Sequence, residues 1–157
     1  MAFKHLIARK DIGALASRLR RRKKRIVFTN GVFDILHRGH VDYLAKAKSF
    51  GDILIVGLNS DQSTRRLKGP ARPLQPQRDR AAILLALAVV DYVVVFGEPN
   101  PEKLIREIRP DVLVKGADYQ ESEIVGAAFV RSYGGTVRRA RLLKDRSTSK
   151  LADKLRS

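Results

Sequence analysis

Two of the three histidines in this 157-residue chain stand three residues apart, in the stretch FTNGVFDILHRGH at residues 28–40. His37 and His40 flank a glycine, and residues at i and i+3 share one side of a helical turn. Two imidazoles on one side of a turn suit phosphate oxygens, either as hydrogen-bond donors or as cations. The pattern therefore favours an anion site over two histidines satisfied by surface backbone groups.

A zinc site is the alternative use of such a pair, and it requires further protein ligands. Asp34 and Asp42 are the nearest candidates, but neither completes a zinc pattern. The chain has no cysteine, which excludes disulfides, thiolate metal sites and cysteine nucleophiles, and which suits a reducing compartment. We therefore predict no metal held by the protein itself.

The histidine pair lies between a strand-like run and a helical pattern, and this alternation recurs along the chain. Strand-like runs cover residues 25–29, 53–58, 92–96, 112–115 and 136–140. Helical patterns cover residues 10–22, 40–50, 77–89, 101–108, 121–133 and 147–156. This order predicts a single-domain, doubly wound parallel α/β sheet, with a basic N-terminal helix within residues 1–23 and a catalytic core at 24–157.

In such a sheet the ligand lies at the carboxyl ends of the strands, where the histidine pair falls. Gly31 lets the backbone approach a ligand, and Gly39 leaves room at a helix N-terminus, whose free N–H groups attract anions. Residues 64–80, TRRLKGPARPLQPQRDR, form the one long stretch predicted to be irregular, and it is rich in proline and cations. We interpret it as a binding loop.

The formal net charge is +16 and the sequence pI is about 10.8, which indicates polyanionic or phosphorylated partners. Much of this charge lies in RLRRRKKR at residues 18–25. The run has no aromatic residue for base stacking, so we favour a solvated helix end over an RNA or lipid patch. No apolar run is long enough to span a bilayer, so we expect a soluble, cytoplasmic protein.

The stretch TNGVFDILHRGHVDYL (29–44) resembles the signature of the cytidylyltransferase-like nucleotidyltransferases. The resemblance runs from about residue 24 to 155 and includes VGLNSD (56–61), RRLKG (65–69) and RSTSK (146–150). Within it, VKGADYQESEIVGA (114–127) is similar to the adenylyltransferases that act on D-glycero-D-manno-heptose 1-phosphate. Ala117 and Asp145 stand where that branch usually has glycine, and Asp145 puts the geometry of its loop in doubt.

The resemblance implies a Rossmann-like nucleotidyltransferase fold and a reaction in which ATP and heptose 1-phosphate give ADP-heptose and pyrophosphate. The product would serve bacterial lipopolysaccharide or surface-glycan synthesis. The nucleophile is a phosphate oxygen that is already anionic, so no general base is needed. Catalysis then consists of in-line positioning and charge neutralisation, with Mg²⁺ held mainly by the phosphates.

The resemblance also assigns roles to individual residues. The expected catalytic residues are His37, His40 and Lys68. The expected ATP-binding residues are Thr29, Asn30, Gly31, Val32, Phe33, Gly39, Arg80, Lys115, Gly116, Asp118, Ser147, Thr148 and Ser149. The expected substrate-binding residues are Asp34, Asn59 and Lys68.

Two other functions stay open at this point. One is a cytidylyltransferase or flavin-type adenylyltransferase acting on another phosphorylated acceptor, such as glycerol 3-phosphate. The other is an RNA-binding protein on the same scaffold, which predicts salt-dependent RNA binding that survives loss of His37 and His40. The resemblance further implies a separate sugar kinase in the pathway, and it makes a homodimer plausible.

Overall fold

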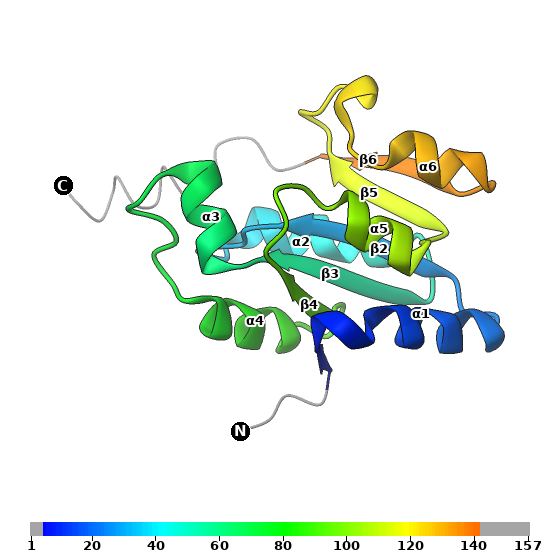
Figure 1. Ribbon diagram of the computed structural model, residues 1–157, viewed down its shortest axis with the longest axis horizontal. Helices are drawn as coiled ribbons and strands as arrows, with labels where there is room; N and C mark the ends of the chain where they lie inside the picture. The colour runs from blue at the N-terminus through cyan, green and yellow to red at the C-terminus, as the bar shows by residue number, and fades with distance from the viewer. Residues whose placement is uncertain (1–4, 142–157) are drawn as a thin grey trace.

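The computed structural model describes residues 5–141, whose strands all belong to one six-stranded parallel sheet (Figure 1). The strand order is β1-β4-β3-β2-β5-β6, and every neighbouring pair is parallel. The strands are β1 (Leu6–Ile7), β2 (Ile26–Gly31), β3 (Ile53–Asn59), β4 (Tyr92–Phe96), β5 (Val112–Gly116) and β6 (Thr136–Ala140). This confirms the predicted parallel sheet.

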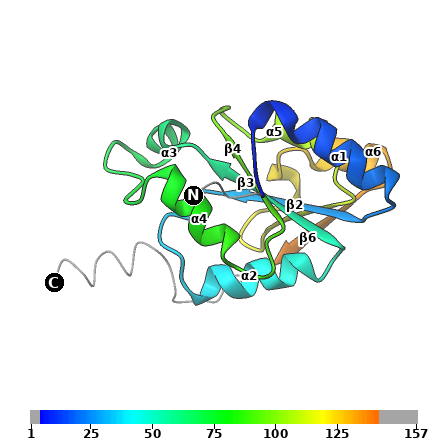
Figure 2. The same cartoon turned by 90° about the horizontal axis from the view of Figure 1, so that it is seen from below.

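Helices cover both faces of the sheet, as Figure 2 shows from below. The α-helices are α1 (Ile12–Arg21), α2 (Arg38–Lys48), α3 (Asp61–Lys68), α4 (Gln77–Leu85), α5 (Glu102–Ile108) and α6 (Ala127–Ser132). Two 3₁₀ turns are η1 (Arg9–Asp11) and η2 (Glu121–Glu123). One apolar cluster joins the sheet to α1, α5 and α6, and another joins its opposite face to α2 and α4.

The apolar strands explain this double layer, because successive side chains of a strand point to opposite faces. In β2, Ile26 and Phe28 pack into the cluster under α1 and α5, whereas Val27 between them packs into the cluster under α2. All three side chains are fully buried. A strand buried on both faces therefore appears in the sequence as a continuous apolar run.

The chain changes direction across the sheet between β2 and β5. It runs outward from β2 through β3 to β4, and then returns to β5 on the other side of β2. In open α/β sheets a ligand binds at such a switch point, beyond the carboxyl ends of the strands. The loops that follow β2 and β5 are thus the expected walls of a site.

Three details of the predicted elements are wrong. Residues 61–68 form helix α3, so the irregular stretch is shorter than predicted and covers residues 69–76. Only Ser63 and Thr64 of α3 are buried, so its sequence lacks the apolar period that marks a helix. The helix expected at 121–133 is split at Gly126, whose φ is +83°. The two-residue strand β1 was not predicted.

Within residues 5–141, no helix is both long and apolar enough to cross a membrane. The helix predicted at 147–156 lies outside the described residues.

Candidate active site

A cavity of about 760 Å³ opens at the carboxyl ends of the strands. It is lined from the loop after β2, from the end of α3, from the β4–α5 turn and from the segment that follows β5. Of the residues expected to bind substrates, it gathers Asn30, Gly31, Val32, Phe33, Asp34, His40, Asn59, Lys68, Lys115, Gly116 and Asp118. The predicted switch-point site is therefore a physical cavity.

His37 begins helix α2 as its N-cap residue, with extended backbone (φ −136°, ψ 170°). Its Nδ1 accepts a hydrogen bond from the backbone N–H of Gly39 at 3.1 Å. A ring nitrogen that accepts carries no proton, so a neutral His37 holds its proton on Nε2. His37 does not line the cavity itself, but its ring lies against that of His40, with 3.9 Å between centroids.

His40 lines the cavity, and its Nδ1 is buried without a hydrogen-bond partner among the described residues. If Nδ1 carried the proton, it would be a buried N–H without an acceptor, which is rarer in proteins than an unused lone pair. The proton of a neutral His40 is therefore assigned to Nε2. Burial lowers the pKa of His40 to about 4, and electrostatic interaction with His37 and with Lys68 acts in the same direction. At neutral pH His40 is therefore an uncharged N–H donor, with capacity for a second proton when an anion arrives.

The loop between β2 and α2 holds an unusual backbone conformation at Phe33, whose φ is +48°. A Cβ at Gly31 would lie 3.0 Å from the Phe33 ring, so glycine lets that ring fold back over the strand end. The edge of the same ring meets His40, with 5.4 Å between centroids. Left-handed backbone at a bulky residue persists only where its surroundings fix it, and such strain is typical of functional loops.

Lys115 and Asn30 meet across the switch point, on neighbouring strands β5 and β2. The Lys115 ammonium donates a hydrogen bond to the Asn30 side-chain oxygen and lies 5.7 Å from the centre of the Tyr119 ring. Lys115 is only 9% exposed, and burial lowers its pKa to about 8. The cavity thus contains a desolvated cation whose one hydrogen-bonded side chain is neutral, and such a cation interacts strongly with an anion.

Asp34 fixes the loop that follows α3. Its carboxylate accepts hydrogen bonds from the backbone N–H groups of Leu74 and Gln75 at 2.8–3.0 Å and pairs with Arg72 at 2.9 Å. Burial raises the pKa of Asp34, but these bonds outweigh that effect and hold it below its usual range. Asp34 was expected to bind substrate, and in the structure its oxygens anchor the loop that carries Arg72 into the cavity wall.

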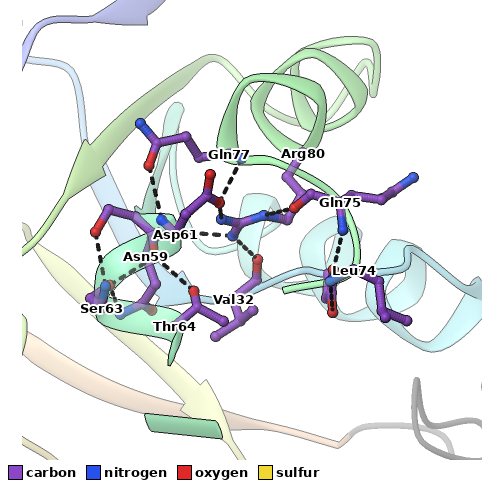
Figure 3. Close-up of polar contacts among 11 residues, drawn as sticks. Val32, Asn59, Asp61, Ser63, Thr64, Leu74, Gln75, Gln77 and Arg80 are labelled. Atoms are coloured by element: carbon purple, nitrogen blue, oxygen red, sulfur yellow. Dashed lines mark hydrogen bonds and ion pairs between the residues drawn. The ribbon is translucent and has the colours of Figure 1, made fainter. Parts of the chain in front are cut away.

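Arg80 was expected to contact ATP, yet it does not line the cavity. It is 1% exposed and binds the backbone around the cavity, as Figure 3 shows. Its guanidinium donates to the carbonyls of Val32 (2.6 Å), Asn59 (3.0 Å) and Gln75 (2.9 Å), and to the Asp61 carboxylate (2.7 Å). Arg80 therefore supports the site from behind, because it holds two lining residues by their carbonyl groups.

Asp61 extends this support to the helix that carries Lys68. Its carboxylate accepts from the Gln77 backbone N–H at 2.8 Å, while its own N–H donates to the Gln77 side-chain oxygen at 2.9 Å (Figure 3). These reciprocal bonds join the first turns of α3 and α4. At the other end of α3, exposed Lys68 reaches the cavity rim.

Two further predicted ATP-binding residues also lie behind the cavity surface. Thr29 is fully buried, and its hydroxyl bonds the Tyr43 hydroxyl at 2.7 Å, which in turn donates to the Val114 carbonyl at 3.2 Å. Gly39 is buried beneath His37, to which it donates. Ser147, Thr148 and Ser149 lie outside the described residues.

The cavity also contains residues that the sequence reasoning missed. They are Tyr43, Leu67, Arg72, Phe96, Pro99, Asn100, Pro101, Tyr119, Glu123, Ile124 and Val125. The β4–α5 turn could have been found, since every strand of a parallel sheet ends at the same edge. Arg72 had a signal too, because it lies in the cationic stretch 64–80 that was interpreted as a binding loop.

Most charged side chains that line the cavity fall into two groups. Lys68 and Arg72 come from α3 and the loop after it, and His40 of α2 is an uncharged donor, whereas Asp118 and Glu123 come from the segment after β5. Lys115, at the end of β5, and Asp34, which pairs with Arg72, also line the cavity. In residues 5–141, no three His, Asp or Glu side chains come close enough to hold a metal ion. The described site can therefore receive anions on one wall and hydroxyl or amino groups on the other.

A family model described as cytidylyltransferase-like matches residues 28–146, a range that includes the histidine turn and most of the cavity. The chain belongs to the cytidylyltransferase-like family of nucleotidyltransferases. Among curated relatives, it is 55% identical over 136 residues to bifunctional protein HldE of Syntrophotalea carbinolica, covering 87% of this chain and 28% of that protein. It is 54% identical over 150 residues to bifunctional protein HldE of Wolinella succinogenes, covering 96% of this chain and 31% of that protein.

The chain thus spans less than a third of the length of these relatives. Solved structures agree on the nucleotidyltransferase-like fold. A lipopolysaccharide core biosynthesis protein from Thermoplasma volcanium superposes with a TM-score of 0.64 at 34% identity, covering 78% of this chain and 99% of that one. A pantoate-beta-alanine ligase from Francisella tularensis shares the fold, with a TM-score of 0.63 at 21% identity. The match covers 92% of this chain and 69% of that one.

Proposed function

We propose that this chain transfers the adenylyl group of ATP to D-glycero-D-manno-heptose 1-phosphate, giving ADP-heptose and pyrophosphate. The observation that carries the proposal is the cavity, in which His40, Lys68 and Lys115 converge within the matched family region. The heptose acceptor is supported by the resemblance of VKGADYQESEIVGA (114–127), which supplies one wall of the cavity, and by likeness to a lipopolysaccharide core biosynthesis protein.

In the proposed reaction a phosphate oxygen of the sugar attacks the α-phosphorus of ATP. A new P–O bond forms on one side, the bond to the bridging α–β oxygen breaks on the other, and pyrophosphate leaves with that electron pair. The nucleophile is already anionic, so no proton has to be removed. Cationic and N–H groups that stabilise the spreading negative charge are then sufficient for catalysis.

The chain's own groups suit that task. His40 offers an uncharged Nε2–H to a phosphate oxygen, and His37, packed against it, is assigned the neighbouring phosphate oxygen. Lys68 and Arg72 add positive charge at the rim, and Lys115 adds a desolvated cation within the cavity. Mg²⁺ enters as part of the substrate MgATP, held by phosphate oxygens and water.

The opposite wall suits the uncharged part of a substrate. Asp118 and Glu123 would repel a phosphate, but their carboxylates can accept hydrogen bonds from sugar hydroxyls or from the adenine amino group. We assign the triphosphate to the histidine side and these groups to the segment after β5. A phosphoryl transfer from ATP to a heptose would supply the acceptor, and we expect the enzyme to work in the cytoplasm.

The test is pyrophosphate release from purified protein with Mg²⁺, D-glycero-β-D-manno-heptose 1-phosphate and ATP, CTP, GTP or UTP, each added separately. Turnover with ATP that is lost in His37→Ala supports the reaction, the substrate and the site together. Turnover with CTP alone would keep the mechanism and exclude the adenylyl donor. Folded protein that releases no pyrophosphate with any nucleotide would contradict the proposed reaction.

A further inference from the structure

The strongest feature that the proposed reaction leaves unused is a cationic surface at the other edge of the sheet. Helices α1, α5 and α6 precede β2, β5 and β6, which are neighbours in the sheet. Since these strands are parallel, the carboxyl ends of the three helices meet at the amino edge of the sheet, away from the cavity. Figures 1 and 2 both show the ends of α1 and α6 at the same end of the molecule.

Seven of the eight residues from 18 to 25 are lysine or arginine, and the end of α1 delivers them to this edge. Arg20 is held inward, because its guanidinium donates to the Ile108 carbonyl at the end of α5. The others are exposed: Arg18, Arg21, Arg22, Lys23, Lys24 and Arg25. We call these six residues, together with Arg109 just after α5, the basic edge.

The nearby carboxylates do not neutralise the basic edge. Asp52 accepts from the Arg25 backbone N–H and Asp111 from the Ile26 backbone N–H, both at 2.7 Å. Among residues 5–141, no ion pair involves a side chain of the basic edge. The field of these cations is therefore directed to solvent.

Backbone conformation gives a second, independent indication. Lys23 has a φ of +55° and closes α1 with a Schellman motif, in which Lys23 N–H donates to Arg20 and Lys24 N–H to Leu19. Arg109 closes α5 with a φ of +47°. Glycine normally occupies such left-handed positions, and the chain does use Gly134, at φ +87°, just after α6.

Favourable interaction with helix dipoles explains some cations at helix ends, but not this choice of residues. Arg18, Arg21 and Arg22 already lie in the last turn or at the cap of α1. A glycine at position 23 would relieve the backbone and still leave them there. Lys23 and Arg109, the two positions in left-handed backbone on this edge, both carry a cation. The chain therefore keeps positive charge there even though glycine would adopt this backbone with less strain.

Although the sequence alone favoured a solvated helix end for residues 18–25, we propose that the basic edge docks this protein on the surface of an anionic phospholipid bilayer. Each lysine or arginine near such a surface attracts its phosphates, and clusters of this size are typical of peripheral attachment. The run has no exposed apolar side chain, since Leu19 is 5% exposed and Ile26 fully buried, so nothing inserts into the acyl region. The cavity, at the opposite edge, stays open to its soluble substrates.

One feature of the basic edge favours a bilayer over nucleic acid. The rings beside the basic edge already lie against cations: Tyr133 is beneath the Arg109 guanidinium at 4.7 Å, and Phe50, whose carbonyl bonds Arg25, lies against Lys46 and Arg138. Neither ring is free for base stacking. A planar array of phosphates demands neither stacking nor insertion.

The test is co-sedimentation of the whole chain with phosphatidylcholine vesicles, with and without 30% phosphatidylglycerol, at 50, 150 and 500 mM NaCl. We expect binding to the anionic vesicles alone, weakening as salt rises. In the variant Arg21→Gln/Arg22→Gln/Lys24→Gln, the partition coefficient should fall by about 100-fold. Pyrophosphate release in solution should stay as in the parent protein.

A matched control separates this edge from overall charge. The variant Arg65→Gln/Arg78→Gln/Lys103→Gln removes three exposed cations from the other end of the molecule and leaves the same net charge. It should bind vesicles as the parent does. Equal loss in both variants, no binding to anionic vesicles at 50 mM NaCl, or binding of RNA but not of vesicles would each overturn the proposal.

Discussion

The two edges of the sheet both hold residues in left-handed backbone, but in opposite surroundings. Among the described residues, the non-glycine positions with positive φ are Phe33 at the carboxyl edge and Lys23 and Arg109 at the amino edge. Phe33 is 7% exposed, and its ring lies against Gly31 and His40. Arg80 holds the carbonyl of the preceding residue, Val32. Lys23 and Arg109 are exposed and are held by helix-end backbone bonds.

The difference shows what each kind of site requires. At the carboxyl edge, Asp34, Asn59, Arg80 and Lys115 are all at most 9% exposed. Asp34 and Arg80 bond backbone groups, and Asn59 and Lys115 bond the side chains of Ser63 and Asn30. A reaction that depends on in-line geometry needs such rigid placement. At the amino edge the cations are exposed, and a diffuse anionic surface requires only their charge.

The largest effect should follow from the loss of His40. We expect His40→Ala to reduce kcat by about 10²–10³-fold, since one preorganised donor to the transferred phosphate is lost. Steady-state pyrophosphate release measures this. His5→Ala is the matched control, because His5 lies at β1, where its ring bonds the Asp91 carbonyl and stacks on Tyr92. Comparable losses in both variants would contradict the assignment of chemistry to the carboxyl edge.

Arg80→Lys should have the next largest effect. A lysine cannot reach the three carbonyls and the Asp61 carboxylate that the guanidinium joins, so we expect about 3 kcal/mol lower free energy of unfolding in urea. Arg78→Lys, exposed on the same helix, should change it by less than about 0.5 kcal/mol.

Turnover distinguishes positioning by Arg80 from simple stabilisation. If Arg80 fixes Val32 and Asn59 for catalysis, kcat of Arg80→Lys should fall at temperatures where the protein remains folded. A parent-like kcat in the folded variant would mean that the cavity keeps its shape without this support.

The pH dependence of stability should identify His40 as a titrating group of the carboxyl edge. Its pKa is about 4 in the folded protein, because of burial and nearby positive charge, and about 6.5 when unfolded. Between these values the unfolded chain binds the extra proton, so the free energy of unfolding rises with pH up to about 6.5 and then levels off.

We expect this contribution to be about 1–2 kcal/mol once partial exposure is allowed for. It is measured as the difference between the parent and His40→Gln in urea unfolding at pH 4.5, 5.5 and 7.0. A difference that does not grow with pH would mean that the imidazole is solvated.

The sequence predicted the parallel sheet well, because strands buried on both faces appear as apolar runs, as in ILIVGL before Asn59. It also predicted the histidine turn, since that motif is local in sequence. It failed for α3, whose stability depends on the Ser60 cap and on Asp61–Gln77 bonds instead of an apolar stripe.

The support that Arg80 and Asp34 give to the backbone could not be predicted for a related reason. Both belong to motifs that resemble substrate-binding segments, and a charged residue beside a phosphate site suggests ligand contact. Only the three-dimensional arrangement shows that their charges are used by backbone groups of Val32 and Leu74. Sequence spacing locates a site, but it does not distinguish the residues that touch a ligand from those that support them.

The smallest effect, and the sharpest contrast between the edges, should come from Lys23→Gly. Glycine adopts positive φ without a Cβ clash, so the free energy of unfolding should increase, by up to about 1 kcal/mol. Vesicle partition should fall about fivefold because one cation is lost. Phe33→Gly also relieves a left-handed residue, yet turnover should fall because the ring that packs on His40 is gone.

Lys23→Ala serves as the control, since it removes the same charge and keeps the strained backbone. It should show the loss in vesicle binding without the gain in stability, which thermal unfolding and co-sedimentation of the three proteins can resolve. If Lys23→Gly is no more stable than Lys23→Ala, the left-handed turn carries no cost and the choice of lysine needs no function. If Lys23→Gly is more stable than the parent but binds vesicles less well, the amino edge, like the carboxyl edge, keeps a residue in strained backbone because that side chain contributes to binding.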